Sequence, residues 1–513
     1  MDLISLDALL GGLSVLADPN VHLFIFIGAV VGMVFGAAPG LTAPAAVALM
    51  LPLTYDMGLD TSLALLLGIY CSGYFAGSIP AILINTPGTP GNAATALDGY
   101  PMARAGHGDR AISAATISSF IGGLVSLVLL VTISPTLASF ALTFTSVEYF
   151  SLAMLGIVCV AGISSGALMK GIAAALIGVF VATIGLDPTS GVPRLTFGIP
   201  DLLAGVPIIP ALIGLFAVSE MLLKSSRKQT KQEILGTANR TPVWSVVRDH
   251  VTHKWLALKS ALIGIFIGLL PGTGPAIASW VAYSEALRTK TDKDRFGKGE
   301  IKGVIACESA NNAVTGGAMV PLLTLGIPGD PVTAILIGAL MIQGIEPGPF
   351  FIRDHGSTFI AIAVLLFVSN IWMVVLGLAS RGYLAKVVKI PAHILVPLIS
   401  VLAAAGGFAI NNSSFDVMLI VLFGALGYFL VRYEFPVAAV VLGIVLGPIL
   451  ENNLRNALVG SGMDPLVFFT RPISAVILVI MVLLLWVWSA QERRQKKLAR
   501  QTFGTSLPRD AES

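Results

Sequence analysis

The sequence is apolar almost from end to end, and this constrains the possible fold more than any other feature. Between Val21 and Trp488 no stretch longer than about 35 residues shows the polar alternation of a solvated surface. Hydrophobic residues make up 55% of the 513 residues and charged residues only 12%, against about 25% charged in a typical soluble domain. The chain is therefore predicted to be an all-α polytopic membrane protein, with the membrane domain occupying nearly its whole length.

The basic residues are clustered, and their clusters predict the topology. Of the 31 lysines and arginines, 20 lie in the segments 224–259, 288–302 and 491–513. Such segments are typically cytoplasmic under the positive-inside rule. A nucleic-acid or anionic-lipid patch is the weaker interpretation, because each run also contains acids and lacks interleaved aromatic residues.

An apolar stretch with basic residues at both ends is predicted to form a hairpin. It lies between Lys259 and Arg288, with the sequence PGTGP at 271–275 in its middle. A single crossing would put one basic end outside the cell, and an arm over 260–270 would rise only about 16 Å against a hydrocarbon core of about 30 Å. We therefore expect a re-entrant helical hairpin that enters and leaves on the cytoplasmic side.

The proline-glycine motifs occur twice, which predicts two homologous halves. The pattern GxxxGxxPG occurs at 32–40 and at 264–272, and PGTP at 87–90 corresponds to PGDP at 328–331. We expect each half to contain a re-entrant helical hairpin and a broken transmembrane helix. Counting hairpins as non-crossing leaves five crossings in the first half, and an odd number predicts two inverted-topology repeats.

These inferences give a predicted organisation and orientation. The amino-terminal twenty residues contain acids but no lysine or arginine, so we expect a retained, periplasmic N-terminus rather than a cleaved signal peptide. The C-terminus is predicted to be cytoplasmic. The predicted segments are a periplasmic or interfacial segment (1–20), a first membrane repeat (21–223), a cytoplasmic linker (224–259), a second membrane repeat (260–450), a periplasmic loop and final transmembrane helix (451–490) and a cytoplasmic tail (491–513).

The helix breaks are the predicted place for ligand binding. Thr89-Pro90 and Asp330-Pro331 each resemble an N-cap followed by proline at the first helical position. A half-helix beginning there would expose backbone N–H groups that attract anions, unless the prolines merely kink packed helices. The predicted substrate-binding residues are Thr42, Asn85, Thr86, Gly88, Thr89, Asn92, Ser309, Asn311, Asn312 and Gly329.

The intramembrane acids and the hairpin tips are candidates for binding a coupling cation. Asp98 is expected to cap the end of its span, and Glu220 and Glu285 to be solvated near the cytoplasmic interface. Glu308 and Asp330 flank the second break in the sequence, so we expect the cation in the second half and the anion at Thr89. The predicted coupling-ion residues are Gly40, Gly272, Thr273, Gly274, Glu308 and Asp330. We expect Na⁺ or H⁺ as the ion, and no cofactor or bound metal beyond a transported Na⁺.

One motif suggests an enzyme instead. Residues 162–166 satisfy G-x-S-x-G with Ser164 in the nucleophile position, which would require a facing histidine. Only His22 and His393 lie within apolar segments, and no H-E-x-x-H or Walker A sequence is present. We therefore predict that the chain is not an enzyme, with a membrane scaffold or an intramembrane hydrolase using Ser164 as the alternative.

Four blocks of sequence resemble a known family. They include GMVFGAAPGLTAPAAVALM at 32–50, INTPGTPGNAATALDGYPMARAG at 84–106, LPGTGPAIASW at 270–280 and ESANNAVTGGAMVPLLTLGIPGDP at 308–331. Together they resemble the large membrane (TctA-type permease) subunit of tripartite tricarboxylate transporters. The resemblance implies uptake of tricarboxylates or related organic carboxylates across a bacterial inner membrane, driven by an ion gradient. It also implies two partners, a small TctB-type membrane subunit and a periplasmic TctC-type solute-binding protein.

Overall fold

The structure is a computed structural model of the chain and describes residues 5–162, 168–226, 240–291, 293–379, 381 and 392–502. Its contacts divide the chain into two compact units. One unit contains Met1–Phe144 and Thr183–Tyr433, and the other contains Thr145–Ala182 and Glu434–Ser513. Each unit takes helices from both predicted halves of the sequence.

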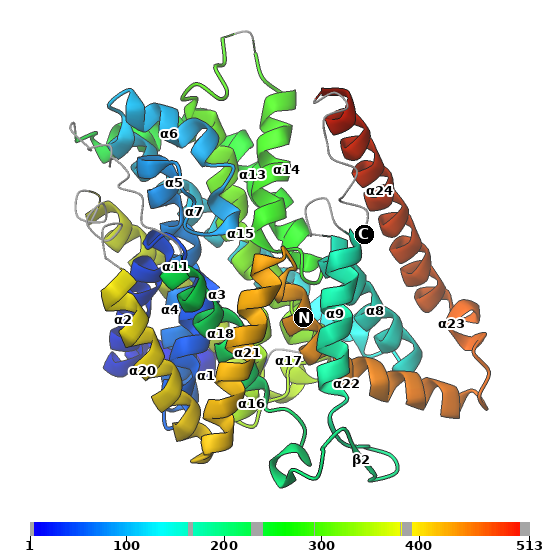
Figure 1. Ribbon diagram of the computed structural model, residues 1–513. Helices are drawn as coiled ribbons and strands as arrows, with labels where there is room; N and C mark the ends of the chain where they lie inside the picture. The colour runs from blue at the N-terminus through cyan, green and yellow to red at the C-terminus, as the bar shows by residue number, and fades with distance from the viewer. Residues whose placement is uncertain are drawn as a thin grey trace. The chain divides into compact units, whose positions relative to one another are not determined.

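The larger unit is built almost entirely of helices (Figure 1). Its first part contains α1 (Leu6–Leu13), η1 (Ser14–Ala17), α2 (Pro19–Ala37), α3 (Ala43–Met50), η2 (Leu51–Thr54), α4 (Leu59–Ala76), α5 (Ser78–Ile84), η3 (Pro90–Asn92), α6 (Ala96–Arg104) and α7 (Gly108–Ala141). Its middle part contains β1 (Gly185–Leu186), antiparallel to β2 (Pro193–Arg194), then η4 (Pro200–Leu202), α10 (Ile208–Leu212), the π-helical turn η5 (Ile213–Val218), α11 (Ser219–Ser226) and α12 (Val243–Thr252). Its last part contains α13 (Lys254–Leu269), α14 (Gly274–Arg288), α15 (Ile301–Leu325), α16 (Pro331–Ile342), α17 (Phe351–Asp354), α18 (Gly356–Ala379), α20 (Ala392–Asn411) and α21 (Ser414–Arg432).

The smaller unit is also helical. It contains α8 (Ser146–Gly162), α9 (Leu168–Ala182), α22 (Val437–Gly460), α23 (Val467–Thr470) and α24 (Pro472–Thr502). The buried Glu148 carboxylate accepts hydrogen bonds from Thr145 and pairs with Arg471 at 2.7 Å. This ion pair ties the start of α8 to the residue before α24.

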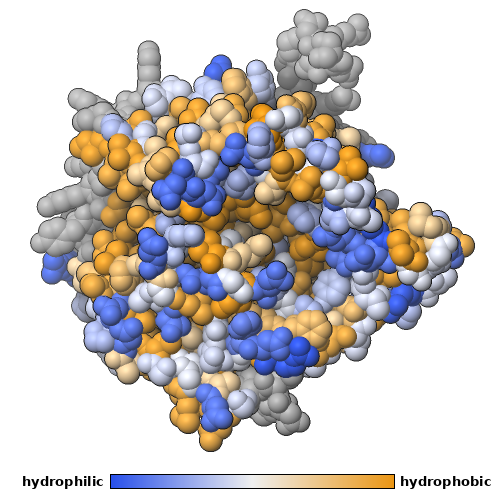
Figure 2. Space-filling model, turned by 90° about the horizontal axis from the view of Figure 1, so that it is seen from below, coloured by the Kyte–Doolittle hydropathy of each residue, from blue (hydrophilic) through white to orange (hydrophobic). Residues whose placement is uncertain are grey.

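Nine helices among the described residues are long and apolar enough to cross a membrane. The first of the nine, Pro19–Ala37, lies where the sequence predicts an arm of a non-crossing hairpin, yet its 19 residues are enough to cross. Large apolar side chains such as Phe266, Phe367 and Val421 are exposed. Figure 2 shows hydrophobic residues mixed with hydrophilic ones on the face seen from below.

The two GxxxG motifs pack their helices against the next long helix of each half. A Cβ on Gly32 would lie 2.6 Å from the Ile69 carbonyl oxygen of α4, and a Cβ on Gly264 would lie 2.2 Å from the Ala310 carbonyl oxygen of α15. Side chains at these positions would prevent the close approach, so the glycines set the packing of α2 on α4 and of α13 on α15.

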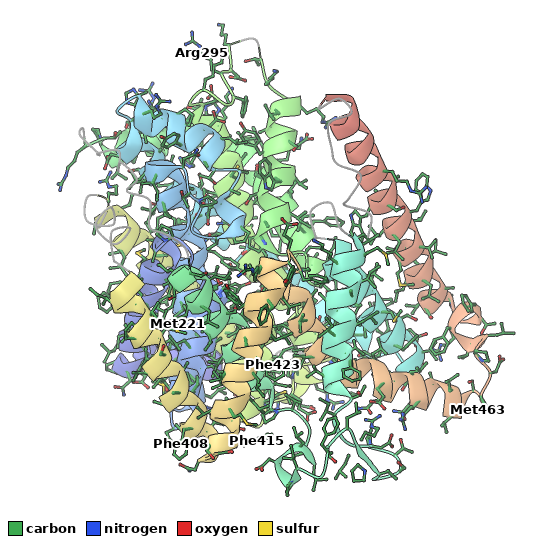
Figure 3. The ribbon with its side chains drawn as sticks, viewed as in Figure 1. Met221, Arg295, Phe408, Phe415, Phe423 and Met463 are labelled. Atoms are coloured by element: carbon green, nitrogen blue, oxygen red, sulfur yellow. The ribbon has the colours of Figure 1, made fainter. Side chains whose placement is uncertain are left out.

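The segment predicted as the second hairpin is a pair of adjacent helices. α13 and α14 pack against each other and against α15, and the three helices lie together in the upper part of Figure 1. The Lys259 side chain bonds to Glu285, so the start of α13 and the end of α14 are neighbours. The loop after α14 carries Arg295, labelled at the upper edge of Figure 3.

The two predicted breaks lead into different structures. At the second break α15 ends at Gly326 in a left-handed conformation (φ 70°), and Asp330 then caps the twelve-residue α16 through a capping box with Thr333. At the first break α5 ends at Asn85 (φ 55°), but Pro90 begins only the three-residue 3₁₀ turn η3. The half-helix expected at Thr89 is therefore wrong. Helix α6 begins only at Ala96, and Gly91 and Asn92 are poor helix formers.

Candidate functional site

The turn between α13 and α14 brings the two breaks together. A Cβ on Gly91, in the first break, would lie 3.0 Å from the Pro275 Cβ at the start of α14. A Cβ on Gly274 would lie 3.9 Å from the Cβ of Asp330 and from the Cδ of Pro331, in the second break. We call this meeting point of the α13–α14 turn with both breaks the junction.

Glu308 of α15 lies at the first break and not beside Asp330. Its Oε1 accepts hydrogen bonds from Asn92 Nδ2 at 3.0 Å and from the Thr95 hydroxyl at 2.5 Å. Its Oε2 accepts from the Ser119 hydroxyl of α7 at 3.3 Å and from Asn311 Nδ2 at 3.4 Å. A carboxylate from the second half of the chain thus sits among polar groups of the first half.

Asp330 shows the reverse arrangement. Its Oδ2 accepts hydrogen bonds from the phenol groups of Tyr70 and Tyr74 of α4, at 2.6 and 2.8 Å. Its Oδ1 accepts from the backbone N–H and the hydroxyl of Thr333, at 2.7 and 2.9 Å. A carboxylate at the second break is therefore held by side chains of the first half.

Asn311 connects the two carboxylates. Its Nδ2 donates to the Tyr74 carbonyl oxygen at 3.0 Å as well as to Glu308. Its Oδ1 is buried and has no hydrogen-bond partner among the described residues. This oxygen lies next to Gly91, since a Cβ on Gly91 would be only 2.4 Å from it. Buried acceptors without a partner are uncommon in native interiors, and among the described residues the Oδ1 atoms of Asn312 and Asn370 share this feature.

Two polar residues at the first break, Thr89 and Asn92, bond to each other. The Thr89 hydroxyl donates to Asn92 Oδ1 at 2.5 Å, and both residues are buried. The Thr86 hydroxyl donates to the Ile84 carbonyl oxygen at 3.4 Å. Asn85 is exposed and forms the left-handed end of α5. Of the predicted first-break residues, the structure thus brings Thr89 and Asn92 to the junction.

The remaining residues predicted at the breaks are buried against neighbouring helices. Asn312 does not bond to Glu308, and its Nδ2 donates to the Cys71 carbonyl oxygen at 3.1 Å. The Ser309 hydroxyl is buried, with no hydrogen-bond partner among the described residues. Gly88 and Gly329 each fit closely against a GxxxG glycine, since a Cβ on Gly88 would lie 2.0 Å from the Gly36 oxygen and a Cβ on Gly329 2.4 Å from the Gly268 oxygen.

The two predicted hairpin tips have different partners. At the first tip, Thr42 donates through its backbone N–H (3.0 Å) and its hydroxyl (2.6 Å) to the Glu220 carboxylate. At the second tip, the Thr273 hydroxyl donates to the Leu270 oxygen at 3.0 Å, and no side chain caps α14. The tip glycines Gly40, Gly272 and Gly274 have φ values of 80°, 73° and 64°, a region that favours glycine.

Two acids differ from their predicted surroundings. Glu220 was expected to be solvated, but it is half-buried because it binds Thr42 across the fold. Asp98 was expected to cap its own helix, but its Oδ1 accepts three backbone N–H groups of the α14–α15 loop, from Gly297, Gly299 and Glu300 at 2.8–3.1 Å. Its Oδ2 accepts from Tyr283 at 2.9 Å. In both cases the partners come from distant parts of the sequence.

Four residues that bond to the junction carboxylates were not predicted from the sequence: Tyr70, Tyr74, Thr95 and Ser119. A signal for the tyrosines was present, because residues four apart share one face of a helix and Tyr70 aligns with Asn311 when the two proline-glycine motifs are superimposed. No local pattern distinguished Thr95 or Ser119 from the many other small polar residues of the chain.

The sequence matches the description "Tripartite tricarboxylate transporter TctA family" over residues 23–442. The chain belongs to this family. It is therefore a multi-pass component of a membrane transporter family, in agreement with its nine apolar helices among the described residues. Ser164, the nucleophile of the hydrolase alternative, lies outside the described residues.

Two relatives from Agrobacterium vitis extend the comparison. The "Uncharacterized 52.8 kDa protein in TAR-I ttuC' 3'region" is 37% identical over 480 residues, which cover 94% of this chain and 95% of the relative. The "Uncharacterized protein in TAR-II ttuC' 3'region" is 42% identical over 215 residues, which cover 42% of this chain and 89% of the relative. No solved structure matches the chain.

Proposed function

We propose that the chain is the large transmembrane permease subunit of a secondary transporter that imports tricarboxylates or related organic carboxylates, driven by a Na⁺ or proton gradient. The observation that carries the proposal is the junction, together with membership of the family. Interrupted helices that meet inside a helical bundle supply free backbone groups at depth, which is how secondary transporters commonly bind substrates and ions.

We place the substrate carboxylate at the first turn of α14 rather than at Thr89. A helix of fifteen residues begins there with no side-chain cap, whereas η3 at Thr89 has three residues. The first half contains a related arrangement: Thr42-Ala43-Pro44 opens α3 as Thr273-Gly274-Pro275 opens α14, and the Glu220 carboxylate accepts the backbone N–H and the hydroxyl of Thr42, the N-cap of α3. Backbone N–H groups at a helix start favour anions in the same way.

We propose that the two halves are inverted repeats with re-entrant hairpins. The pairwise packing supports two repeated halves, while the inversion rests on the odd number of crossings predicted for the first half. In the larger unit α21 packs against η5 and α11, with Gly214 against the Ile420 carbonyl oxygen; in the smaller unit α22 packs against α9, with Gly178 against the Val440 carbonyl oxygen. α9 and α21 occupy equivalent places in the two halves, as do α22 and the segment of η5 and α11. Each of the two pairs therefore joins a helix of one half to a helix of the other half, and exchanging the halves converts one pair into the other.

The proposal includes partners and a location. Members of the family normally work with TctB- and TctC-type partners. We infer that this chain works with a small membrane subunit and a periplasmic solute-binding protein in the bacterial inner membrane, with a periplasmic N-terminus and a cytoplasmic C-terminus. A cysteine at Lys293 should then react with an impermeant reagent only from the cytoplasmic side. Labelling from the periplasm would contradict this orientation.

An uptake assay tests the function. Cells that lack the chain and express both partners should not accumulate labelled tricarboxylates, and expression of the chain should restore uptake. Unlabelled organic carboxylates should compete, whereas neutral analogues such as the corresponding amides should not. Uptake that is independent of the chain would refute the proposal and favour the scaffold alternative.

A further inference from the structure

We propose that Glu308, together with Asn92, Thr95, Ser119 and Asn311, forms a Na⁺-binding site. The inference rests on the proposed function only where it treats this Na⁺ as the coupling ion. Binding of Na⁺ at Glu308 is a property of the chain that does not require transport.

The charge of the site is the first argument. Glu308 is fully buried, and its four hydrogen-bond partners are two hydroxyls and two amides, all neutral. No lysine or arginine among the described residues bonds to it. A buried, ionised carboxylate with neutral partners is unfavourable unless it takes up a proton or a positive charge accompanies it. A monovalent cation supplies this charge.

The oxygen atoms around Glu308 are the second argument. The Asn311 side chain bonds to Glu308 through Nδ2, and its Oδ1 is buried with no hydrogen-bond partner among the described residues. The hydroxyls of Thr95 and Ser119 can turn a lone pair towards a cation. In the structure the Asn92 oxygen accepts the Thr89 hydroxyl. If the Asn92 amide flips, this oxygen faces Glu308 and Asn92 Nδ2 donates to the Thr89 hydroxyl instead. The set contains only oxygen ligands, which hard cations prefer.

Asp330 is also buried among neutral partners, and each carboxylate oxygen of Asp330, like each of Glu308, accepts two hydrogen bonds. The difference is that Asp330 caps α16, whose positive end compensates part of its charge. Glu308 lies inside α15 and caps no helix start, so we assign the cation site to Glu308 and a structural role to Asp330.

The position of the site explains how an ion would influence the fold. Glu308 and Asn311 come from α15, in the second half, whereas Asn92, Thr95 and Ser119 come from the first half. A cation bound to oxygens of both halves would stabilise the arrangement in which the first break lies against α15. Because a ligand favours the conformation that binds it more tightly, Na⁺ would shift the population towards this arrangement.

The test measures Na⁺ binding without transport. The purified full-length chain in detergent is heated in mixtures of NaCl and choline chloride at constant ionic strength, and unfolding is followed by tryptophan fluorescence. We expect Na⁺ to raise the melting temperature in a saturable way. Glu308→Gln should abolish the response, whereas Asp330→Asn should lower the melting temperature but leave the Na⁺ midpoint unchanged.

Milder variants keep the test informative if Glu308→Gln does not fold. Thr95→Val and Asn311→Ala retain the carboxylate but each remove a ligand, and each should raise the Na⁺ midpoint about tenfold or more. A wild-type protein that responds to pH but not to Na⁺, or a Glu308→Gln variant with the wild-type midpoint, would overturn the site. Failure of uptake with normal Na⁺ midpoints would refute only the transport function.

Discussion

Alanine substitutions at Gly88 and Gly329 test the packing of both breaks with one pair of variants. A Cβ on Gly88 would lie 2.0 Å from the Gly36 carbonyl oxygen and 2.7 Å from the Gly77 Cα. A Cβ on Gly329 would lie 2.4 Å from the Gly268 carbonyl oxygen and 2.7 Å from a backbone atom of α15. All these neighbours are backbone atoms, which cannot turn aside as the end of a flexible side chain can.

The expected loss of stability follows from these distances. Overpacking a well-packed interior typically costs about 1–3 kcal/mol, and a clash with backbone places both variants at the upper end, about 3 kcal/mol. Gly338→Ala in α16 is the matched control, because its Cβ would meet only side-chain atoms at 3.6 and 3.7 Å. Alanine is also the better helix former by about 1 kcal/mol, so this variant should be as stable as the wild type or more stable.

Thermal unfolding of the purified variants checks this reasoning. Gly88→Ala and Gly329→Ala should both melt well below the wild type, by similar amounts, and Gly338→Ala should not. If both variants melt like the wild type, the two breaks do not pack closely against the GxxxG helices α2 and α13. If only one is destabilised, the two breaks are not equivalent.

Three further predictions concern residues around the junction and the linker. Asp98→Ala leaves three backbone N–H groups without their acceptor, which costs about 1–3 kcal/mol of stability for each group that stays buried. Trypsin should therefore cut the α14–α15 loop faster than in the wild type. Cleavage at the wild-type rate would contradict this role. Tyr70→Phe and Tyr74→Phe each remove one hydrogen bond to the Asp330 carboxylate and should destabilise the protein by about 1.5–3 kcal/mol; unchanged melting of both would count against the Asp330 site. Burial lowers the pKa of His250 in α12, where Nε2 bonds to a serine hydroxyl of α7 at 2.7 Å. The unfolded state then binds the proton more readily, so the docking of α12 is stable above about pH 6.5 and weakens below it; hydrogen exchange in α12 should accelerate on acidification in the wild type but not in His250→Phe.

The positions of the breaks could be predicted because their cause is local. Proline lacks the backbone N–H and fixes φ, so a Pro-Gly pair inside an apolar run interrupts a helix wherever it occurs. The start of α16 at Pro331 followed from Asp330 as N-cap, and the structure has this helix with a complete capping box.

The partners of the buried acids could not be predicted, because they depend on which helices pack together. Glu308 is near the second break in sequence, yet α15 packs along α7 and directs this carboxylate to the first break. Asp98 and Glu220 likewise bond to loops and tips far away in the chain. At Thr89 even the local prediction was wrong, since Gly91 and Asn92 come after Pro90 and disfavour a helix.

Uptake by reconstituted vesicles tests the central claim most directly. Proteoliposomes containing the chain and the small membrane subunit would receive the solute-binding protein loaded with a labelled tricarboxylate, with an imposed inward Na⁺ or proton gradient and no ATP. We predict accumulation that requires the chain and one of the two gradients and that stops when the gradient is collapsed. Accumulation that persists after both gradients are collapsed, or that needs ATP, would contradict the account.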